Sequence, residues 1–137
     1  MAEWKKPLPR ITPETKTYWE GCKRHELVIP HCKDCGEYYF YPRALCPYCF
    51  SSNIEFVKSN GKGKVHTFTV TYQNRARGFV DEVPYVMAWV ELPEQGNVQL
   101  MSNIIDCEPE DVKVGMPVQV VFVDATDEIT IPLFKPA

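Results

Sequence analysis

The chain has 137 residues, a length typical of one compact body or of two small modules that share a surface. Apolar residues make up 45% and charged residues 24%, as in ordinary soluble globular proteins. No stretch approaches the roughly 20 consecutive apolar residues that cross a bilayer. The N-terminal segment MAEWKKPLPR also has no apolar core of the kind found in secretory signals. We therefore expect a cytoplasmic protein with no membrane partner.

Charge is unevenly distributed along the chain, although the net charge is only −3. Residues 1–80 contain 13 Lys and Arg against 7 Asp and Glu, whereas residues 81–137 contain 2 against 11. The basic half favours contact with phosphates. The acidic half disfavours a protein that wraps itself in nucleic acid.

Residues 1–26 are predicted to form an N-terminal arm and helix. Two prolines keep the first eleven residues extended, and Thr12 followed by proline predicts a helix start. The segment 13–26 is periodic and places three side chains on one stripe: Tyr18, Trp19 and Cys22. Gly21 weakens the segment, which indicates one short helix or two. The stripe either covers the core of the neighbouring module or docks in part on a partner.

Residues 27–58 contain two Cys-x-x-Cys pairs, formed by Cys32, Cys35, Cys46 and Cys49. Without a secretory signal, this pattern indicates metal binding and not disulfides. Two such knuckles supply the four tetrahedral thiolates that Zn²⁺ prefers, although the same ligands also suit a single iron. We predict one zinc ion, and its role is structural because no coordination position is left for a water molecule.

No catalytic constellation accompanies these cysteines. Cys22 and His25 lie three residues apart but lack further ligands, and Cys107 is interpreted as a plain buried thiol. The sequence contains no Ser-His-Asp order and no pair of carboxylates typical of a hydrolase. A protein that is not an enzyme is therefore expected.

Residues 59–137 are predicted to form a five-stranded OB-fold barrel. After Gly61 and Gly63 the chain becomes rich in β-branched and aromatic residues. Strands are predicted at residues 65–72, 85–92, 98–105, 117–123 and 129–134, with a helical turn between the third and the fourth. A β-sandwich remains the alternative. The predicted fold is thus mainly β, with an N-terminal helical arm, a zinc ribbon and a barrel.

The order of short motifs along the chain is specific. They are Tyr18-Trp19-Glu20-Gly21, Glu26-Leu27, Cys32-x2-Cys35-Gly36, Tyr41-Pro42-Arg43, Cys46-Pro47-x-Cys49, Gly61-x-Gly63-x-Val65, Phe79, Pro84-Tyr85-Val86, Val90-Glu91-Leu92, Pro109-Glu110-Asp111-Val112, Gly115-Met116-Pro117-Val118 and Pro132-Leu133-Phe134. From about residue 12 to its end, the chain resembles the zinc-ribbon plus OB-fold proteins associated with acyl-CoA metabolism. Phe50, in place of a more usual glycine, is a local difference from that pattern.

The resemblance implies a rubredoxin-like zinc ribbon at residues 27–58, preceded by a helical arm and followed by an OB barrel. It also implies a non-catalytic subunit that binds acyl-CoA and associates with thiolase-superfamily enzymes or acyl-CoA hydratases. The family is not known for a catalytic residue of its own.

Two sets of residues are candidates for these contacts. Coenzyme A carries phosphates, for which four cations near the barrel entry and its first long loop are suited: Lys62, Lys64, Arg75 and Arg77. Phe79 in the same loop is a candidate apolar contact for the ligand. The alternative is that these cations form a solvated rim. The candidate partner contacts are Trp4, Tyr18 and Trp19, because their segment is too short to bury all three in its own core.

Nucleic-acid binding is the competing hypothesis, since zinc ribbons and OB folds both occur in nucleic-acid-binding proteins. The acidic second half and the absence of cations from the segment PVQVVFV make it the weaker one.

Overall fold

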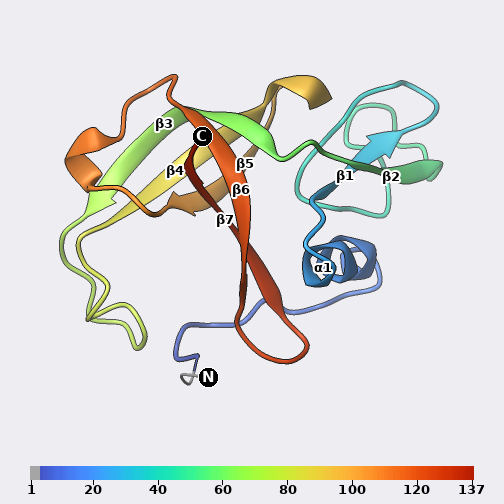
Figure 1. Cartoon of the computed structure of the whole chain (residues 1–137). Helices are drawn as coiled ribbons and strands as arrows, with labels where there is room; N and C mark the ends of the chain where they lie inside the picture. The colour runs from blue at the N-terminus through green and yellow to red at the C-terminus, as the bar shows by residue number, and fades with distance from the viewer. Residues whose placement is uncertain (1–3) are drawn as a thin grey trace.

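The computed structural model describes residues 4–137 and consists of a small two-stranded sheet, one short helix and a closed barrel (Figure 1). The barrel occupies one side of the molecule and the small sheet the other, with the helix below the small sheet. This arrangement confirms the predicted mainly β fold with a helical arm, a ribbon and a five-stranded barrel. The predicted domain boundaries after residues 26 and 58 stay predictions.

Helix α1 spans Lys16–Lys23, so it begins later than the predicted start at Pro13. Residues 13–15 form a turn instead, because the backbone N–H of Thr12 donates to the hydroxyl of Thr15 over 2.9 Å. The helix ends at Lys23 with Arg24 as its C-cap, and the next residue, His25, has a left-handed φ of 61°. In this conformation the N–H of Glu26 reaches the carbonyl of Gly21 over 2.8 Å, as in a helix C-cap. None of the helices among residues 4–137 is long and apolar enough to span a membrane.

The small sheet pairs β1 (Val28–Cys32) with β2 (Ile54–Lys58) in antiparallel register. Strand β2 was not predicted, because its residues lie beyond the cysteine pairs on which the prediction for this segment was based. The aromatic run at residues 38–41 pairs with this sheet through one bridge, from Tyr38 to His31. Tyr39 of this run is buried, and its hydroxyl donates to the carbonyl of Arg43 over 2.9 Å, whereas Tyr41 is exposed.

The barrel strands lie close to the predicted positions. They are β3 (Lys62–Thr71), β4 (Tyr85–Leu92), β5 (Val98–Ile104), β6 (Pro117–Asp124) and β7 (Thr130–Pro136). Their order around the barrel is β3-β4-β5-β7-β6, and β6 returns to pair with β3. Two 3₁₀ turns, Pro93–Gln95 and Pro109–Asp111, connect strands, and the second is the predicted helical turn.

One hydrophobic core extends from α1 through the ribbon into the barrel. Tyr18 and Cys22 of the helix belong to the same cluster as Val90 and Phe134 of the barrel. The side-chain amide of Gln95, itself buried, donates to the carbonyl of Val57 over 3.1 Å and links the barrel to β2. The apolar stripe of the helix therefore covers a shared core, which is the first of its two predicted roles.

Gly21 provides a test of this packing. A Cβ atom at Gly21 would lie 2.9 Å from Cγ2 of Val28 and 3.0 Å from the carbonyl oxygen of Glu26. We expect Gly21→Ala to destabilise the protein by about 1–2 kcal/mol, because overpacking outweighs the gain in helix propensity. Thr17→Ala on the exposed face of α1 is the matched control. Urea unfolding measures both, and an unchanged or raised midpoint for Gly21→Ala would contradict the tight contact.

Candidate metal centre and binding surfaces

The four predicted metal ligands lie together at one end of the ribbon. The sulfur atoms of Cys32, Cys35, Cys46 and Cys49 all lie within 4.8 Å of one another. The Cys32 and Cys49 sulfurs are 3.5 Å apart, and those of Cys35 and Cys46 are 3.6 Å apart. Four thiolates at about 2.3 Å from a tetrahedral Zn²⁺ would be separated by about 3.8 Å, so the cluster fits the ion closely.

Two similar turns create this geometry. The N–H of Gly36 donates to the carbonyl of Cys32, and the N–H of Phe50 donates to the carbonyl of Cys46, each over 2.9 Å. Gly36 and Phe50 have φ values of 79° and 63°. The left-handed conformation is therefore kept at Phe50 although its side chain disfavours it. The backbone N–H of Cys35 also lowers the pKa of the Cys32 thiol.

His31 is not needed as a ligand. Its Nδ1 atom lies 2.7 Å from a carboxylate oxygen of Glu55, and its ring packs on Tyr38. The chemistry of the four thiols thus defines one structural zinc site, with no position open for catalysis.

A cysteine substitution tests the metal site. We expect the wild-type protein to contain about one zinc ion per chain and Cys46→Ser to contain much less, because three thiolates hold the ion more weakly. Cys107→Ser, outside the cluster, should keep its zinc. Elemental analysis measures the metal, and hydrogen exchange should show loosening of residues 28–50 with a persistent barrel. Wild-type protein with neither zinc nor iron, prepared without chelators, would contradict the site.

The predicted acyl-CoA residues do not form a single cluster. Lys62 and Lys64 lie at the start of β3, whereas Arg75, Arg77 and Phe79 follow its end. The seven steps from Lys64 to Thr71 alone cover about 23 Å of extended strand. Nearness in sequence is therefore misleading here, because a long strand carries the two groups to opposite ends of the barrel.

The N-terminal arm lies against the loop of residues 73–83, which we call the cation loop. Backbone atoms of Lys5 and Lys6 lie 2.7 Å from where a Cβ of Gly78 would be, so only glycine allows this approach. The ammonium group of Lys6 lies 3.1 Å from the Glu82 carboxylate and 5.6 Å from the ring centre of Phe79. A polar depression of about 850 Å³ is formed here by Trp4, Lys5, Lys6, Arg77, Gly78, Val80, Asp81 and Glu82.

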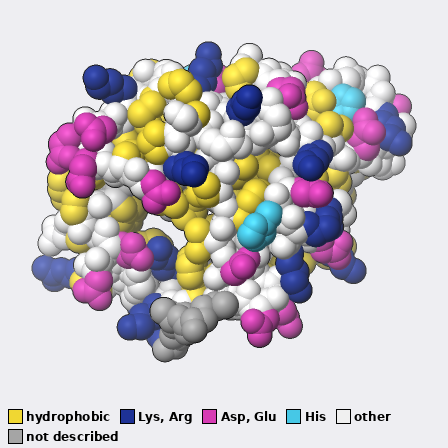
Figure 2. Space-filling model, in the orientation of Figure 1, with side chains coloured by type: hydrophobic (Ala, Val, Ile, Leu, Met, Phe, Trp, Pro, Cys, Tyr) yellow, Lys and Arg dark blue, Asp and Glu magenta, His cyan; other side chains and the backbone are white. Residues whose placement is uncertain are grey.

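These contacts add Lys5 and Lys6 to the predicted cations, which sequence spacing could not reveal across some seventy residues. Acidic groups accompany them, however. On the face shown in Figure 2, Lys and Arg side chains are likewise interspersed with Asp and Glu side chains, and neither sign dominates.

A second depression, which we call the apolar groove, lies between α1, the ribbon and the barrel. Its volume is about 520 Å³, and it is lined by Tyr18, Trp19, Phe40, Tyr41, Trp89, Gln99, Leu100, Met101, Ser102, Asn103, Ile131, Pro132 and Leu133. The indole N–H of Trp19 donates to the hydroxyl of Tyr41 over 2.9 Å, which fixes one wall. Trp89 and Met101 are 40% and 50% exposed, high values for such apolar side chains.

The structure separates the three predicted partner contacts. Trp19 lines the apolar groove, whereas Trp4 lies with the arm beside the cation loop. Tyr18 is only 2% exposed and packs on Phe40 and Tyr41, so it supports the groove from within the chain's own core. Trp89 and Met101 were missed, because alternation along a strand does not show which outward residues adjoin another module.

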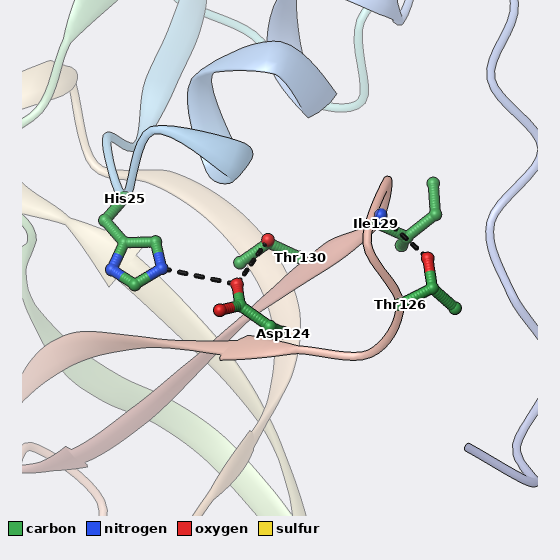
Figure 3. A network of polar contacts seen from close by, with 5 residues as sticks. All are labelled: His25, Asp124, Thr126, Ile129 and Thr130. Atoms are coloured by element: carbon green, nitrogen blue, oxygen red, sulfur yellow. Dashed lines mark hydrogen bonds and ion pairs between the residues drawn. The ribbon is translucent and has the colours of Figure 1, made fainter. Parts of the chain in front are cut away.

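A polar network joins the end of α1 to the β6–β7 hairpin (Figure 3). The imidazole of His25 lies 3.4 Å from a carboxylate oxygen of Asp124 and stacks on Phe122 at 5.2 Å between ring centres. The hydroxyl of Thr130 donates to the same carboxylate oxygen over 2.7 Å. The hydrogen bond from Thr130, followed by that from His25, lowers the pKa of Asp124. This network connects the end of the helix to the barrel at the protein surface.

Comparison with known proteins places this geometry in a family. A family model described as the rubredoxin-like zinc ribbon domain of ChsH2 matches residues 19–55, and one described as its C-terminal OB-fold domain matches residues 56–123. A DUF35 domain-containing scaffold protein of Methanocaldococcus jannaschii is 41% identical over 106 residues, which are 76% of this chain and 73% of that protein. The chain belongs to the DUF35 family of scaffold proteins.

Other relatives carry names from acyl-CoA metabolism. A probable enoyl-CoA hydratase alpha subunit of Thermomonospora curvata is 33% identical over 96% of this chain, which spans only 40% of that protein's length. The benzoylsuccinyl-CoA thiolase subunit BbsA of Geobacter metallireducens is 36% identical over 53% of this chain and 46% of that protein. A solved structure, the Ltp2-ChsH2(DUF35) aldolase, superposes with a TM-score of 0.83 at 33% identity, covering 93% of this chain and 98% of that one. The predicted family is confirmed, and three of its members carry the name of scaffold proteins.

Proposed function

We propose that this DUF35 protein is a scaffolding subunit of a thiolase-superfamily or related acyl-CoA enzyme and contributes to binding of the acyl-CoA. The apolar groove is the observation that carries the proposal, because a large uncharged depression outside the protein's own core is typical of a surface completed by a partner. The thiolase and hydratase subunit names of the relatives support the class of partner.

The thiols of the chain support a role without chemistry of its own. Four of the six are committed to the metal site. Burial raises the pKa of Cys22 to about 12, and burial followed by the charge of Asp111 raises the pKa of Cys107. Since the thiolate is the nucleophilic form, neither residue is suited to attack a thioester. The nucleophile would come from the partner.

For the acyl-CoA, the separation of the predicted cations points to the cation loop. Arg75 and Arg77 lie there on exposed positions, Arg77 in the same depression as Lys5 of the arm, and an arginine fork suits a phosphate. Lys64 pairs with Glu91 at 3.7 Å at the other end of β3. We therefore propose Arg75 and Arg77 as phosphate contacts, with Phe79 as their apolar neighbour, and leave Lys62 and Lys64 to the solvated rim.

Association is the first test. Co-expression with a thiolase-superfamily protein from the same genome should yield a complex that elutes as one species in size-exclusion chromatography at micromolar concentration. The chain alone should show no thiolase, hydratase or thioesterase turnover. Separate elution with every plausible partner, or turnover by the chain alone that Cys22→Ser or Cys107→Ser abolishes, would overturn the scaffold.

Ligand binding is the second test, performed by calorimetry on the complex. The double variant Arg75→Ala, Arg77→Ala should bind acyl-CoA about tenfold more weakly and with a smaller dependence on salt, because two phosphate contacts are lost. The double variant Lys62→Ala, Lys64→Ala removes the same charge at the other end of β3 and should bind normally. Equal weakening by both would show a general charge effect. Tight RNA binding with no response to acyl-CoA would favour the nucleic-acid hypothesis instead.

A further inference from the structure

The barrel is closed at only one rung between β5 and β7. Strand β5 pairs with β4 at seven positions, from Val98 to Ile104. Its pairing with β7 is parallel and consists of Ile104 opposite Phe134, with the N–H of Ile105 donating to the carbonyl of Phe134 over 2.8 Å. Toward the start of β5, no further backbone hydrogen bond joins the two strands within residues 4–137.

Pro132 explains why this ladder stops. Backbone groups of alternate residues point to the same side of a strand, so Phe134 and Pro132 both direct their backbone toward β5. Proline has no N–H and cannot donate at the next rung. The carbonyl of Pro132 accepts instead from the side-chain hydroxyl of Ser102 over 3.1 Å. The interruption is thus encoded by one residue.

A free strand edge results. By the same alternation, Met101 and Gln99 direct their backbone N–H and carbonyl groups toward β7, like Ile105. Within residues 4–137, neither has a strand partner on that side. This edge forms one side of the apolar groove, and none of the thirteen residues that line the groove is Lys, Arg, Asp or Glu.

We propose that this edge accepts an extended, uncharged segment of a partner subunit as an added β-strand. The proposal rests on the scaffolding function and specifies how the partner is held. An added strand satisfies the backbone groups of Gln99 and Met101, which a purely apolar occupant would leave unpaired. The uncharged lining selects against charged side chains, since their burial without partners is costly. Trp19, Tyr41 and Trp89 offer the apolar contacts for alternate side chains of the segment.

The experiment uses random heptapeptides displayed on phage, panned on the whole zinc-loaded chain. The enriched peptides should be uncharged, with alternating apolar residues and no central proline. A synthetic copy should protect the amides of Gln99 and Met101 from hydrogen exchange. Methylation of one central peptide nitrogen should weaken binding about tenfold or more, because a buried backbone hydrogen bond is lost. Failure to enrich any peptide, or binding that is indifferent to N-methylation, would overturn the added strand.

A pair of variants locates the binding. Met101→Arg places a charge in the groove and should abolish peptide binding, whereas Val114→Arg, at a similarly exposed apolar residue outside the groove, should not. The N-methylated peptide tests the proposal on wild-type protein even if Met101→Arg misfolds. Protection of the same two amides by butanoyl-pantetheine, in the absence of peptide, would assign the edge to the thioester and overturn the proposal. A partner complex that forms equally well with folded, zinc-loaded Met101→Arg would do the same while leaving the scaffold intact.

Discussion

The convergence of four thiols on one point constrains the rest of the structure. Cys35 and Cys46 close the ends of a ten-residue segment that has no regular strand. Within it, the hydroxyl of Tyr39 donates a hydrogen bond to the carbonyl of Arg43, and the hydroxyl of Tyr41 accepts one from the indole N–H of Trp19. A bound metal therefore fixes both ends of the segment whose aromatic residues form one wall of the apolar groove. A module of about thirty residues could not hold such a wall with its own core.

The parts of the fold that follow a local pattern were predictable. The spacing of the four cysteines predicts the metal site, and runs of β-branched residues predict the barrel strands. Relations between distant segments were not predictable in this way. The lysines at the start of β3 and the arginines beyond its end are close in sequence, but the extended strand between them holds the two groups far apart. The stripe on α1 was correctly read as apolar, yet sequence could not show that Tyr18 lies inside while Trp19 reaches the groove.

The helix, the ribbon and the barrel are joined at several independent points, which makes the groove between them a preformed surface. Gln95 bonds to the carbonyl of Val57, the His25–Asp124 contact ties the helix to the barrel, and one apolar core passes through all three parts. The walls of the groove belong to different elements but are held in one arrangement before any partner arrives. A preformed surface loses less conformational freedom on association than one assembled from mobile parts, so more of the contact energy remains as affinity.

Pro132 serves two opposed requirements at once. A closed barrel removes strand edges, and with them the risk of unwanted pairing between copies of the chain. Full closure would also remove the edge that a partner strand could use. Strands β5 and β7 pair at Ile104 and Phe134, which joins the barrel. Because Pro132 has no backbone N–H, the pairing does not continue, and the backbone groups of Gln99 and Met101 stay available. The edge is short and lies beside Trp19 and Tyr41, so an occupant must match the groove as well as the backbone. Selectivity arises because side-chain fit and strand pairing are required together.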